Sequence, residues 1–282
     1  MNLSSHLLDA IRRNVEAALA EDIGGGDLTA RLIPAENVAT ATVICREAAV
    51  LCGTAWFEAC FRNLGAGIEI KWHARDGETI AAGLPLCEIH GNARAMLSAE
   101  RPALNFLQTL SATATATRRY VEAAKGTGAC IMDTRKTLPG LRLAQKYAVR
   151  CGGGENQRSG LYDGILIKEN HIMAAGGIRA ALAQAGRIAP QGVPIQIEVE
   201  SLSELEQALE AGARLILLDN FGLETLRKAV KLAGSRAELE ASGGITLETV
   251  RDVAETGVHR ISVGSLTKDI KAVDLSMRFE TR

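Results

Sequence analysis

The sequence lacks an excess of charge of either sign, and it lacks any long apolar run. Lys and Arg together number 32 against 33 for Asp and Glu, which leaves a formal net charge of −1. A nearly neutral chain has no overall field to attract nucleic acid or an anionic membrane surface. The longest aliphatic runs, such as Leu215–Leu218, are far shorter than the roughly 20 residues of a membrane-spanning helix. We therefore expect no nucleic-acid partner and no membrane, so any anion-binding site must be a local cluster.

The sequence also lacks the cysteine and histidine spacings of a metal site. None of its six cysteines forms a C-x-x-C pair, and its five histidines lie far apart in the chain. The N-terminus does not resemble a secretory signal, because Asp9, Arg12 and Glu16 interrupt any apolar segment. We therefore expect reduced cysteines that pack in the interior of a cytoplasmic protein. The apolar residues near the N-terminus share one face of a predicted helix, namely Leu7, Leu8, Ile11, Val15, Ala18 and Leu19.

What the chain does have is length, and its 282 residues predict about two domains. Residues 1–113 mix strand and helix signals irregularly, which is typical of an α+β sandwich. Asp76 and Gly77 mark a turn between two of the strands. In this part we expect strands at residues 41–45, 68–72 and 84–89 and a helix at residues 99–109.

Residues 114–269 are regular, because short apolar runs alternate with helical patterns. Such alternation predicts parallel β-α units, and six of them favour an incomplete or closed α/β barrel, with a doubly wound sheet as the alternative. Ser203 followed by Glu206 predicts a capping box at the start of one helix. The expected strands cover 129–133, 164–167, 194–199, 215–218, 237–241 and 260–263, and the expected helices cover 141–150, 178–188, 203–211, 223–233 and 246–256.

Polar residues follow each of these six strands directly. In a parallel barrel the carboxyl ends of the strands open on one rim, where active sites lie. Loops are polar in general, but that tendency does not explain charged residues set immediately after apolar strands. The sequence therefore predicts one shared site built from the segments Asp133–Thr137, Lys168–His171, Glu198–Glu200, Asp219–Asn220, Ser242–Gly244 and Gly264–Lys268.

The residues of this predicted site sort by charge. Its cations predict a polyanionic substrate, because Arg grips carboxylates and phosphates with paired hydrogen bonds. Its acids either bind Mg²⁺, hold sugar hydroxyls and stabilise positive charge, or only neutralise the cations. Its glycine-bearing turns suit a phosphate group, which backbone N–H groups would bind. The cations are Arg135, Lys136, Arg158 and Lys168, the acids are Glu198 and Asp219, the turns are Ser242-Gly243-Gly244 and Gly264-Ser265, and Thr134 lies beside them.

Three basic residues and one histidine of these segments have two interpretations each. Arg142, Lys146 and Arg150 recur at helical spacing, so they either join the cationic cluster or lie on a solvated helix face. For His171 we favour a supporting hydrogen bond over a direct catalytic role.

Several long motifs resemble those of the quinolinate phosphoribosyltransferase family. The resemblance runs from the N-terminal helix to Ser276-Met277-Arg278, and the motifs that carry it are specific. They are Glu100-Arg101 with Ala103–Gln108, Asp133–Arg142, Lys146–Val149, Gly152–Gly154, Leu166–His171 and Leu217–Phe221.

The resemblance implies a reaction and a set of roles. Quinolinate and phosphoribosyl pyrophosphate would give nicotinate mononucleotide, pyrophosphate and carbon dioxide, with Mg²⁺, in NAD biosynthesis. Lys136 would lie between quinolinate and the pyrophosphate, while Glu198 and Asp219 would hold the ribose and Mg²⁺. The family further implies a homodimer, with larger assemblies left open, in which the segment 270–282 joins the N-terminal domain. Arg101, Arg135, Arg158 and Lys168 would grip quinolinate, with Arg101 supplied by the partner subunit, and Ser242, Gly243 and Gly264 would hold the 5′-phosphate.

The sequence departs from the family pattern at three positions. Gln157 and Lys268 stand at or near positions where many relatives have His, and Gln157 would donate a hydrogen bond without carrying charge. Pro102 follows Arg101 in place of an expected Thr, and we interpret it as the start of a helix. The alternatives that stay open are a nicotinate phosphoribosyltransferase, the paralogue associated with molybdenum transport, and a non-catalytic metabolite sensor.

Overall fold

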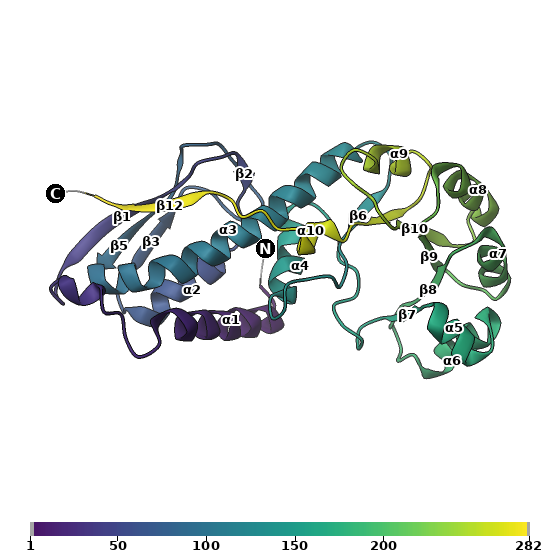
Figure 1. The fold of residues 1–282 in the computed structure, drawn as a ribbon, viewed down its shortest axis with the longest axis horizontal. Coiled ribbons are helices and arrows are strands. Elements are labelled where there is room, and N and C mark those ends of the chain that lie inside the picture. The colour runs from purple at the N-terminus through teal and green to yellow at the C-terminus, as the bar shows by residue number, and fades with distance from the viewer. Residues whose placement is uncertain (1–2, 281–282) are drawn as a thin grey trace. The chain divides into compact units, whose positions relative to one another are not determined.

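A computed structural model describes residues 3–280 of the chain, which packs into two compact units (Figure 1). Unit 1 combines Met1–Arg118, Thr137–Gly153 and Asp269–Arg282. Unit 2 combines Arg119–Lys136 and Gly154–Lys268. Each unit has a sheet of its own, so each is described by itself.

Unit 1 is built on a four-stranded antiparallel sheet in the order β12-β1-β5-β3. Alternate residues of β1 point into the core, and Ala41, Val43 and Cys45 are fully buried. The last strand pairs with β1 in a register that sets Ala41 opposite Phe279, so Leu275–Phe279 is part of this sheet. The strands are β1 (Val38–Cys45), β3 (Glu69–Trp72), β5 (Pro85–Asn92) and β12 (Leu275–Phe279), with a separate short pair of β2 (Ala49–Val50) and β4 (Thr79–Ile80).

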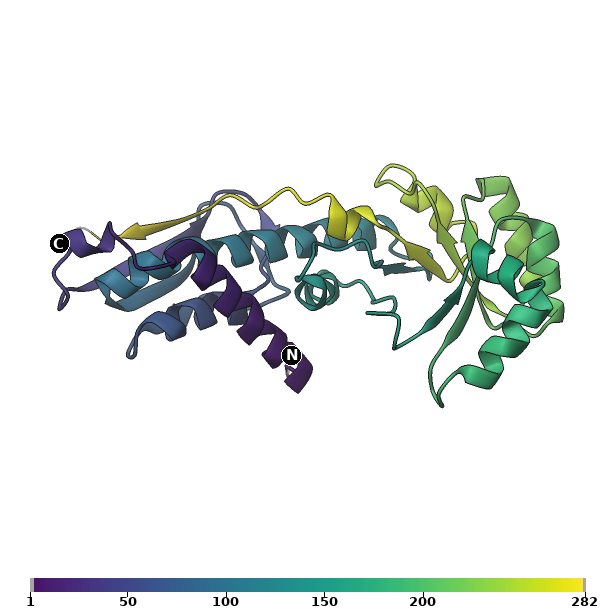
Figure 2. The same cartoon turned by 60° about the horizontal axis from the view of Figure 1, so that its bottom comes forward.

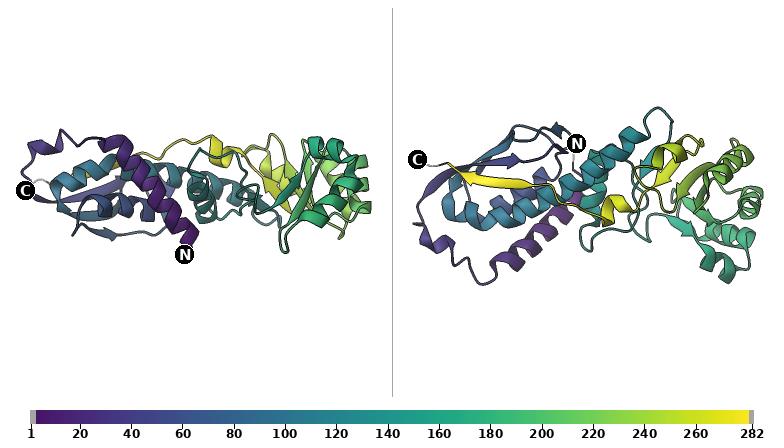
Figure 3. Two further views of the ribbon diagram at one scale, coloured as in Figure 1. Left: turned by 90° about the horizontal axis from the view of Figure 1, so that it is seen from below. Right: turned by 45° about the horizontal axis from the view of Figure 1, so that its top comes forward.

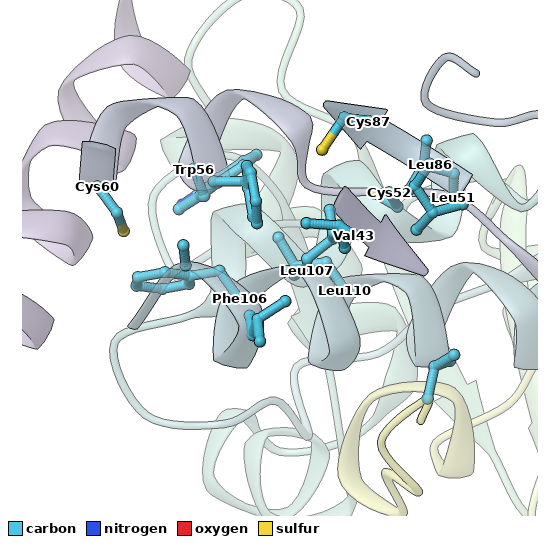
Figure 4. Close-up of a cluster of buried hydrophobic side chains, with 14 of the residues drawn as sticks. Val43, Leu51, Cys52, Trp56, Cys60, Leu86, Cys87, Phe106, Leu107 and Leu110 are labelled. Atoms are coloured by element: carbon cyan, nitrogen blue, oxygen red, sulfur yellow. The ribbon is translucent and has the colours of Figure 1, made fainter. Parts of the chain in front are cut away.

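Helices complete unit 1 (Figure 2), and their apolar faces form one core with the sheet, part of which Figure 4 shows. Trp56, Phe57 and Phe61 of α2 are fully buried, and they share this core with Leu107 and Leu110 of α3. Burial of this apolar area is the main favourable contribution to the stability of the unit. The helices are α1 (Ser5–Ile23), η1 (Ala30–Leu32), α2 (Thr54–Leu64), α3 (Ala93–Ala123) and α4 (Arg142–Cys151).

The predicted start of the third helix at Pro102 is wrong. The helix α3 runs for 31 residues, with Pro102 inside it and buried. A proline within a helix removes one backbone hydrogen bond and costs about 3 kcal/mol. Buried residues on both sides of the proline, including Met96 and Leu107, offset this cost because they pack into the core of unit 1.

Unit 2 is a six-stranded parallel sheet in the order β6-β11-β10-β9-β8-β7. Among the described strands, β6 and β7 each pair with one neighbour, so the predicted incomplete barrel of β-α units is confirmed. Helices α6 to α9 pack against the strands that they connect (Figure 3). The strands are β6 (Cys130–Met132), β7 (Ile165–Ile167), β8 (Ile195–Val199), β9 (Leu215–Asp219), β10 (Glu238–Ser242) and β11 (Arg260–Ser262).

Two details of the helices in unit 2 differ from the prediction. Ser201, not Ser203, caps α7, because the Ser201 hydroxyl accepts a hydrogen bond from the N–H of Glu204 at 3.2 Å. The helix predicted at 246–256 is shorter, since α9 covers only five residues. The helices are α5 (Glu169–Ala175), α6 (Ile178–Ile188), α7 (Leu202–Glu210), α8 (Leu223–Ala233), α9 (Val250–Ala254) and α10 (Ser265–Lys268).

The division into units returns the segment from Asp269 onward to unit 1, within one residue of the prediction, but it places the first boundary at Arg118 instead of 113. The segment Thr137–Gly153 follows the first barrel strand in sequence but packs with unit 1. Its helix buries Ala144, Ala148 and Cys151 in the core of that unit. Within residues 3–280, no helix is both long and apolar enough to cross a membrane.

Candidate active site

Unit 2 contains a cavity of about 290 Å³ whose wall comes from the ends of several strands. The structure gathers eight of the predicted site residues around it, as expected where the carboxyl ends of parallel strands meet. These eight are Thr134, Arg135, Lys136, Arg158, Lys168, Glu198, Asp219 and Ser242. The remaining wall consists of Gln157, Leu166, Leu217 and Ser262.

Lys136 lies on a loop that is fixed from two sides. Its backbone N–H donates to the Thr134 hydroxyl at 3.0 Å, and its carbonyl accepts from the fully buried hydroxyl of Thr267 at 2.7 Å. Gly264 lies next to it, since a Cβ at that position would lie 3.3 Å from Lys136 Cδ. The loop therefore holds the lysine stem beside the turn that follows β11.

Lys168 and Glu198 form an ion pair within the cavity wall. Lys168 Nζ donates to Glu198 Oε2 at 2.7 Å, and the Glu198 side chain is only 12% exposed. The backbone N–H of Lys168 donates to His171 Nδ1 at 3.0 Å, at the start of α5. His171 thus supports Lys168 through a hydrogen bond, which agrees with the favoured interpretation of this histidine.

Asp219 is held by its neighbour Asn220. Asn220 Nδ2 donates to Asp219 Oδ2 at 2.9 Å, and its backbone N–H donates to the carbonyl of Ser242 at 2.9 Å. Asn220 has φ 57°, and Asn tolerates this left-handed conformation better than most residues. A Cβ at Gly243 would lie 2.7 Å from Asn220 Cγ, so only glycine allows this close approach. Asn220 belongs to the predicted rim segment Asp219–Asn220, and its position directly after a rim acid is the signal in the sequence for this supporting role.

Arg135 and Arg158 are near enough to influence each other electrostatically. Partial burial and then the charge of Arg135 lower the pKa of Arg158 below its ordinary value. Arg158 is held in place by a hydrogen bond from Nη1 to the carbonyl of Gly164 at 3.0 Å. Two guanidinium groups arranged in this way favour an anion with two negative groups, because such a ligand removes the repulsion between them.

The segment Glu155–Gly164 lies between the two edge strands and carries Arg158. On one side Glu155 pairs with β6, where its N–H donates to the carbonyl of Ile131 at 2.8 Å. Further along, the Asp163 carboxylate accepts from the N–H groups of Ser159 and Gly160, at 2.7 and 2.9 Å. Burial alone would raise the pKa of Asp163, but these hydrogen bonds outweigh it and lower that pKa. We call residues 155–164 the seam segment.

The other predicted site residues do not line this cavity. Gly243 and Gly244 belong to the turn after β10, and Ser265 is the first residue of α10, where its hydroxyl lies 3.3 Å from the hydroxyl of Tyr120. Arg101 is an exposed residue of α3 in unit 1. Lys146 is also in unit 1, where it is buried, so the interpretation as a solvated helix face is wrong for this residue.

A cluster of metal-ligand types lies elsewhere, in unit 1. Atoms of Cys52, Asp76 and Cys151 all lie within 4.8 Å of one another. The Asp76 carboxylate already has structural partners, because it accepts from the N–H groups of Gly53 and Thr54 and from the Tyr147 hydroxyl at 2.8 Å. Asp76 therefore fixes the first turn of α2, and the described cysteines are all free thiols.

Comparison with known proteins identifies the family. The N-terminal domain of quinolinate phosphoribosyl transferase matches residues 27–111, and its C-terminal domain matches residues 113–278. The chain belongs to the quinolinate phosphoribosyltransferase family. A probable nicotinate-nucleotide pyrophosphorylase [carboxylating] of Bacillus subtilis is 44% identical over 257 residues, which cover 91% of this chain and 89% of the relative. A mitochondrial quinolinate phosphoribosyltransferase [decarboxylating] of Nicotiana tabacum is 37% identical, covering 95% of this chain and 81% of the relative.

Solved structures of this family have the same fold. The nicotinate-nucleotide pyrophosphorylase of Francisella tularensis matches with a TM-score of 0.92 at 44% identity, over 96% of each chain. NadC of Streptococcus pyogenes matches with a TM-score of 0.93 at 38% identity, over 99% of this chain and 98% of that chain. The α+β region and the parallel six-stranded sheet described above are therefore those of the family.

Proposed function

We propose that this chain is an enzyme that transfers the phosphoribosyl group of phosphoribosyl pyrophosphate to quinolinate and releases carbon dioxide. The products are nicotinate mononucleotide, pyrophosphate and carbon dioxide, in the biosynthesis of NAD. The observation that carries this proposal is the cavity of unit 2, in which four cations face two acids on the ends of separate strands. Three anionic groups enter such a reaction, namely a dicarboxylate, a phosphate and a pyrophosphate.

Quinolinate binding is assigned to the arginines and Lys168. Partial burial, and after it the positive charge of Arg135, lowers the pKa of Arg158, so the two guanidinium groups are close enough to repel each other. A dicarboxylate between them would convert that repulsion into two charge-assisted interactions. Lys168 would add a further positive charge to the quinolinate site, while its Nζ also pairs with Glu198.

Glu198 and Asp219 are assigned to the ribose. Displacement at the anomeric carbon develops positive charge on the ring, and preorganised carboxylates stabilise such charge. Glu198 is oriented by Lys168 and Asp219 is oriented by Asn220, so neither acid has to rearrange as the charge develops. Lys136 would stabilise the departing pyrophosphate. In the intermediate that joins the ribose to quinolinate, the positive ring nitrogen stabilises the electron pair that stays on the neighbouring ring carbon when carbon dioxide departs. That carbon then takes up a proton from solvent, so decarboxylation needs no dedicated base.

The residues present fit Mg²⁺. Magnesium binds proteins through one or two carboxylates together with substrate phosphates, and Glu198 and Asp219 both line the cavity. Near these two acids, desolvation and then the charges of Glu169 and Glu204 raise the pKa of Glu200. Glu198 and Asp219 would hold the ion, which would neutralise part of the pyrophosphate charge.

The 5′-phosphate is assigned to the turns after β10 and β11. Ser242 supplies a hydroxyl at the cavity, and the neighbouring glycines leave backbone N–H groups accessible. Gly264 lies against Lys136, which would bring a cation close to the phosphate groups. Ser265, next in sequence, is assigned to the same turn.

Product analysis tests the function. Purified enzyme with Mg²⁺, phosphoribosyl pyrophosphate and quinolinate should release nicotinate mononucleotide and carbon dioxide in equal amounts. Nicotinate in place of quinolinate should give no comparable rate, which distinguishes the nicotinate-using alternative. The Lys136→Ala variant is the control for contaminating activity. Binding of quinolinate without product would indicate a sensor and contradict the proposal.

We also propose a cytoplasmic homodimer in which each site borrows Arg101 from the partner subunit. Arg101 is exposed on a long helix, so it is available to a second copy. Inactive Arg101→Ala and Lys136→Ala subunits, when allowed to exchange, should regain about a quarter of the sites, because each mixed dimer has one intact site. The matched control mixes Arg135→Ala with Lys136→Ala, both from one unit, and should regain nothing. Exchange demonstrated by mass spectrometry without recovery would refute the shared site.

A further inference from the structure

The side-chain amide of Gln157 forms its hydrogen bonds within unit 2. Its nitrogen donates to Glu240 Oε1 and to Gln196 Oε1, the latter at 3.3 Å. An amide nitrogen has two hydrogens, so these two bonds use both of them. Gln157 is thus a neutral hydrogen bond donor, as its side chain implies, and in this structure its donors are taken up by Glu240 and Gln196.

Glu240 is the centre of this buried network. It lies on β10 and is 1% exposed. Its carboxylate accepts from Gln157, from the Ser262 hydroxyl of β11, and from Gln196 Nε2 of β8 at 2.9 Å. A buried carboxylate is stable only when its lone pairs are satisfied, and hydrogen bonds to an ionised acceptor are stronger than neutral ones. Glu240 thus joins two strands of the sheet to the seam segment.

The same segment is held from β6 by a second acid. Asp133 is fully buried, and its two oxygens accept from the Gln157 N–H at 2.9 Å and from Asn156 Nδ2 at 2.6 Å. Asp133 fixes the backbone of Gln157 while Glu240 fixes its side chain. Arg158 is the next residue, so its position in the cavity depends on how these two acids hold the segment.

We propose that Glu240 is a positioning residue for quinolinate binding: through the Gln157 amide it fixes the part of the seam segment that carries Arg158. The guanidinium groups of Arg158 and Arg135 would bind the two carboxylates of quinolinate. The distance between these two groups depends on how Glu240 fixes the seam segment. The proposal rests on the proposed function, because quinolinate is the ligand that those groups bind. It assigns Gln157 to the support of Arg158 and not to contact with the substrate through its amide nitrogen.

The test is Glu240→Gln. This substitution keeps the shape of the side chain but replaces one accepting carboxylate oxygen by an NH₂ group, which cannot accept a hydrogen bond from the surrounding donors. We expect the KM for quinolinate, and the dissociation constant measured by calorimetry, to rise at least tenfold. The KM for phosphoribosyl pyrophosphate should stay within about threefold, because the turns after β10 and β11 keep their backbone. Glu238→Gln is the matched control: it is the same substitution on the same strand, at an exposed residue paired with Arg260, and both constants should be unchanged.

A second substitution separates positioning from loss of fold. Gln157→Leu removes the donor while leaving Glu240 in place, and it should raise the quinolinate dissociation constant to a similar degree. The double variant Glu240→Gln with Gln157→Leu should bind no worse than the weaker-binding single variant, because both act through one bond. If Glu240→Gln does not fold, the proposal is tested with Gln157→Leu and with Ser262→Ala, because each of these removes one hydrogen bond donor to Glu240.

Three outcomes would overturn the proposal. One is a folded Glu240→Gln with unchanged quinolinate affinity. Another is an equal rise in the KM of both substrates, which would indicate general loosening of the unit. The third is full additivity of the two substitutions. Failure of the proposed function looks different, because then the unsubstituted enzyme itself would form no product from quinolinate.

Discussion

The close approach of Gly243 to Asn220 allows a paired test of how Asp219 is held. Gly243 has φ 103°, and an added Cβ would lie 2.7 Å from Asn220 Cγ and 2.9 Å from its backbone N. Gly244, the next residue, has φ 58° and open space around an added Cβ. Gly244→Ala therefore introduces only left-handed backbone strain, about 1–2 kcal/mol. Gly243→Ala adds the clash to such strain, and overpacking costs about 1–3 kcal/mol more.

Urea unfolding of the two variants measures this difference, and steady-state kinetics measures its effect on the site. We expect Gly243→Ala to be the less stable variant and to lose turnover at least tenfold, because displacement of Asn220 releases Asp219. Gly244→Ala should lose less turnover than Gly243→Ala, because it keeps the backbone N–H of the turn and does not displace Asn220. Equal stabilities would refute the steric reasoning, and a destabilised Gly243→Ala with normal turnover would show that Asn220 does not orient Asp219.

Two further predictions concern the acids. Glu198→Gln and Asp219→Asn should each lower kcat about a hundredfold or more while changing the quinolinate KM little, since each removes a preorganised group that faces the developing positive charge; near-normal kcat in either variant would reduce that acid to a counter-ion. Asp163 has a pKa below its ordinary value of 3.8, so its stabilising effect is present above that value and is lost as the pH falls through the lowered pKa. Asp163→Asn should therefore unfold at less urea than the unsubstituted protein at pH 6, with the difference shrinking at pH 3, and a constant difference would contradict this sign.

Much of the fold follows from local patterns in the sequence. The alternation of apolar runs with helical patterns predicts the parallel sheet, and α6 and α8 begin and end at the predicted residues. The length of α3 is not predictable in this way, because tertiary burial on both sides of Pro102 outweighs a local penalty. The placement of Thr137–Gly153 in unit 1 likewise depends on core contacts that are distant in sequence.

Most residues that line the cavity could be predicted, because they lie at or near the carboxyl ends of parallel strands. Lys168 directly follows β7, Asp219 is the last residue of β9, and Arg135 lies in the loop after β6, so the parallel topology alone brings them to one rim. Gln157 illustrates where that rule ends. Its chemistry permits donation to a substrate, but in the structure it donates to Glu240, the buried middle residue of β10. Only the three-dimensional arrangement decides which acceptor receives the donor.

Five carboxylates of unit 2 fall into two groups that differ in position and in hydrogen-bond partners, although all of them are acidic side chains. Glu198 and Asp219 line the cavity, each held by one neighbouring side chain. Asp133, Asp163 and Glu240 instead accept hydrogen bonds from the seam segment. The first and last strands of the sheet do not pair with each other among the described residues, so this segment has no continuous ladder on both sides to hold it. Hydrogen bonds to side-chain acceptors hold the segment instead of a strand ladder. They thereby fix the position of Arg158 at the open edge of the incomplete barrel.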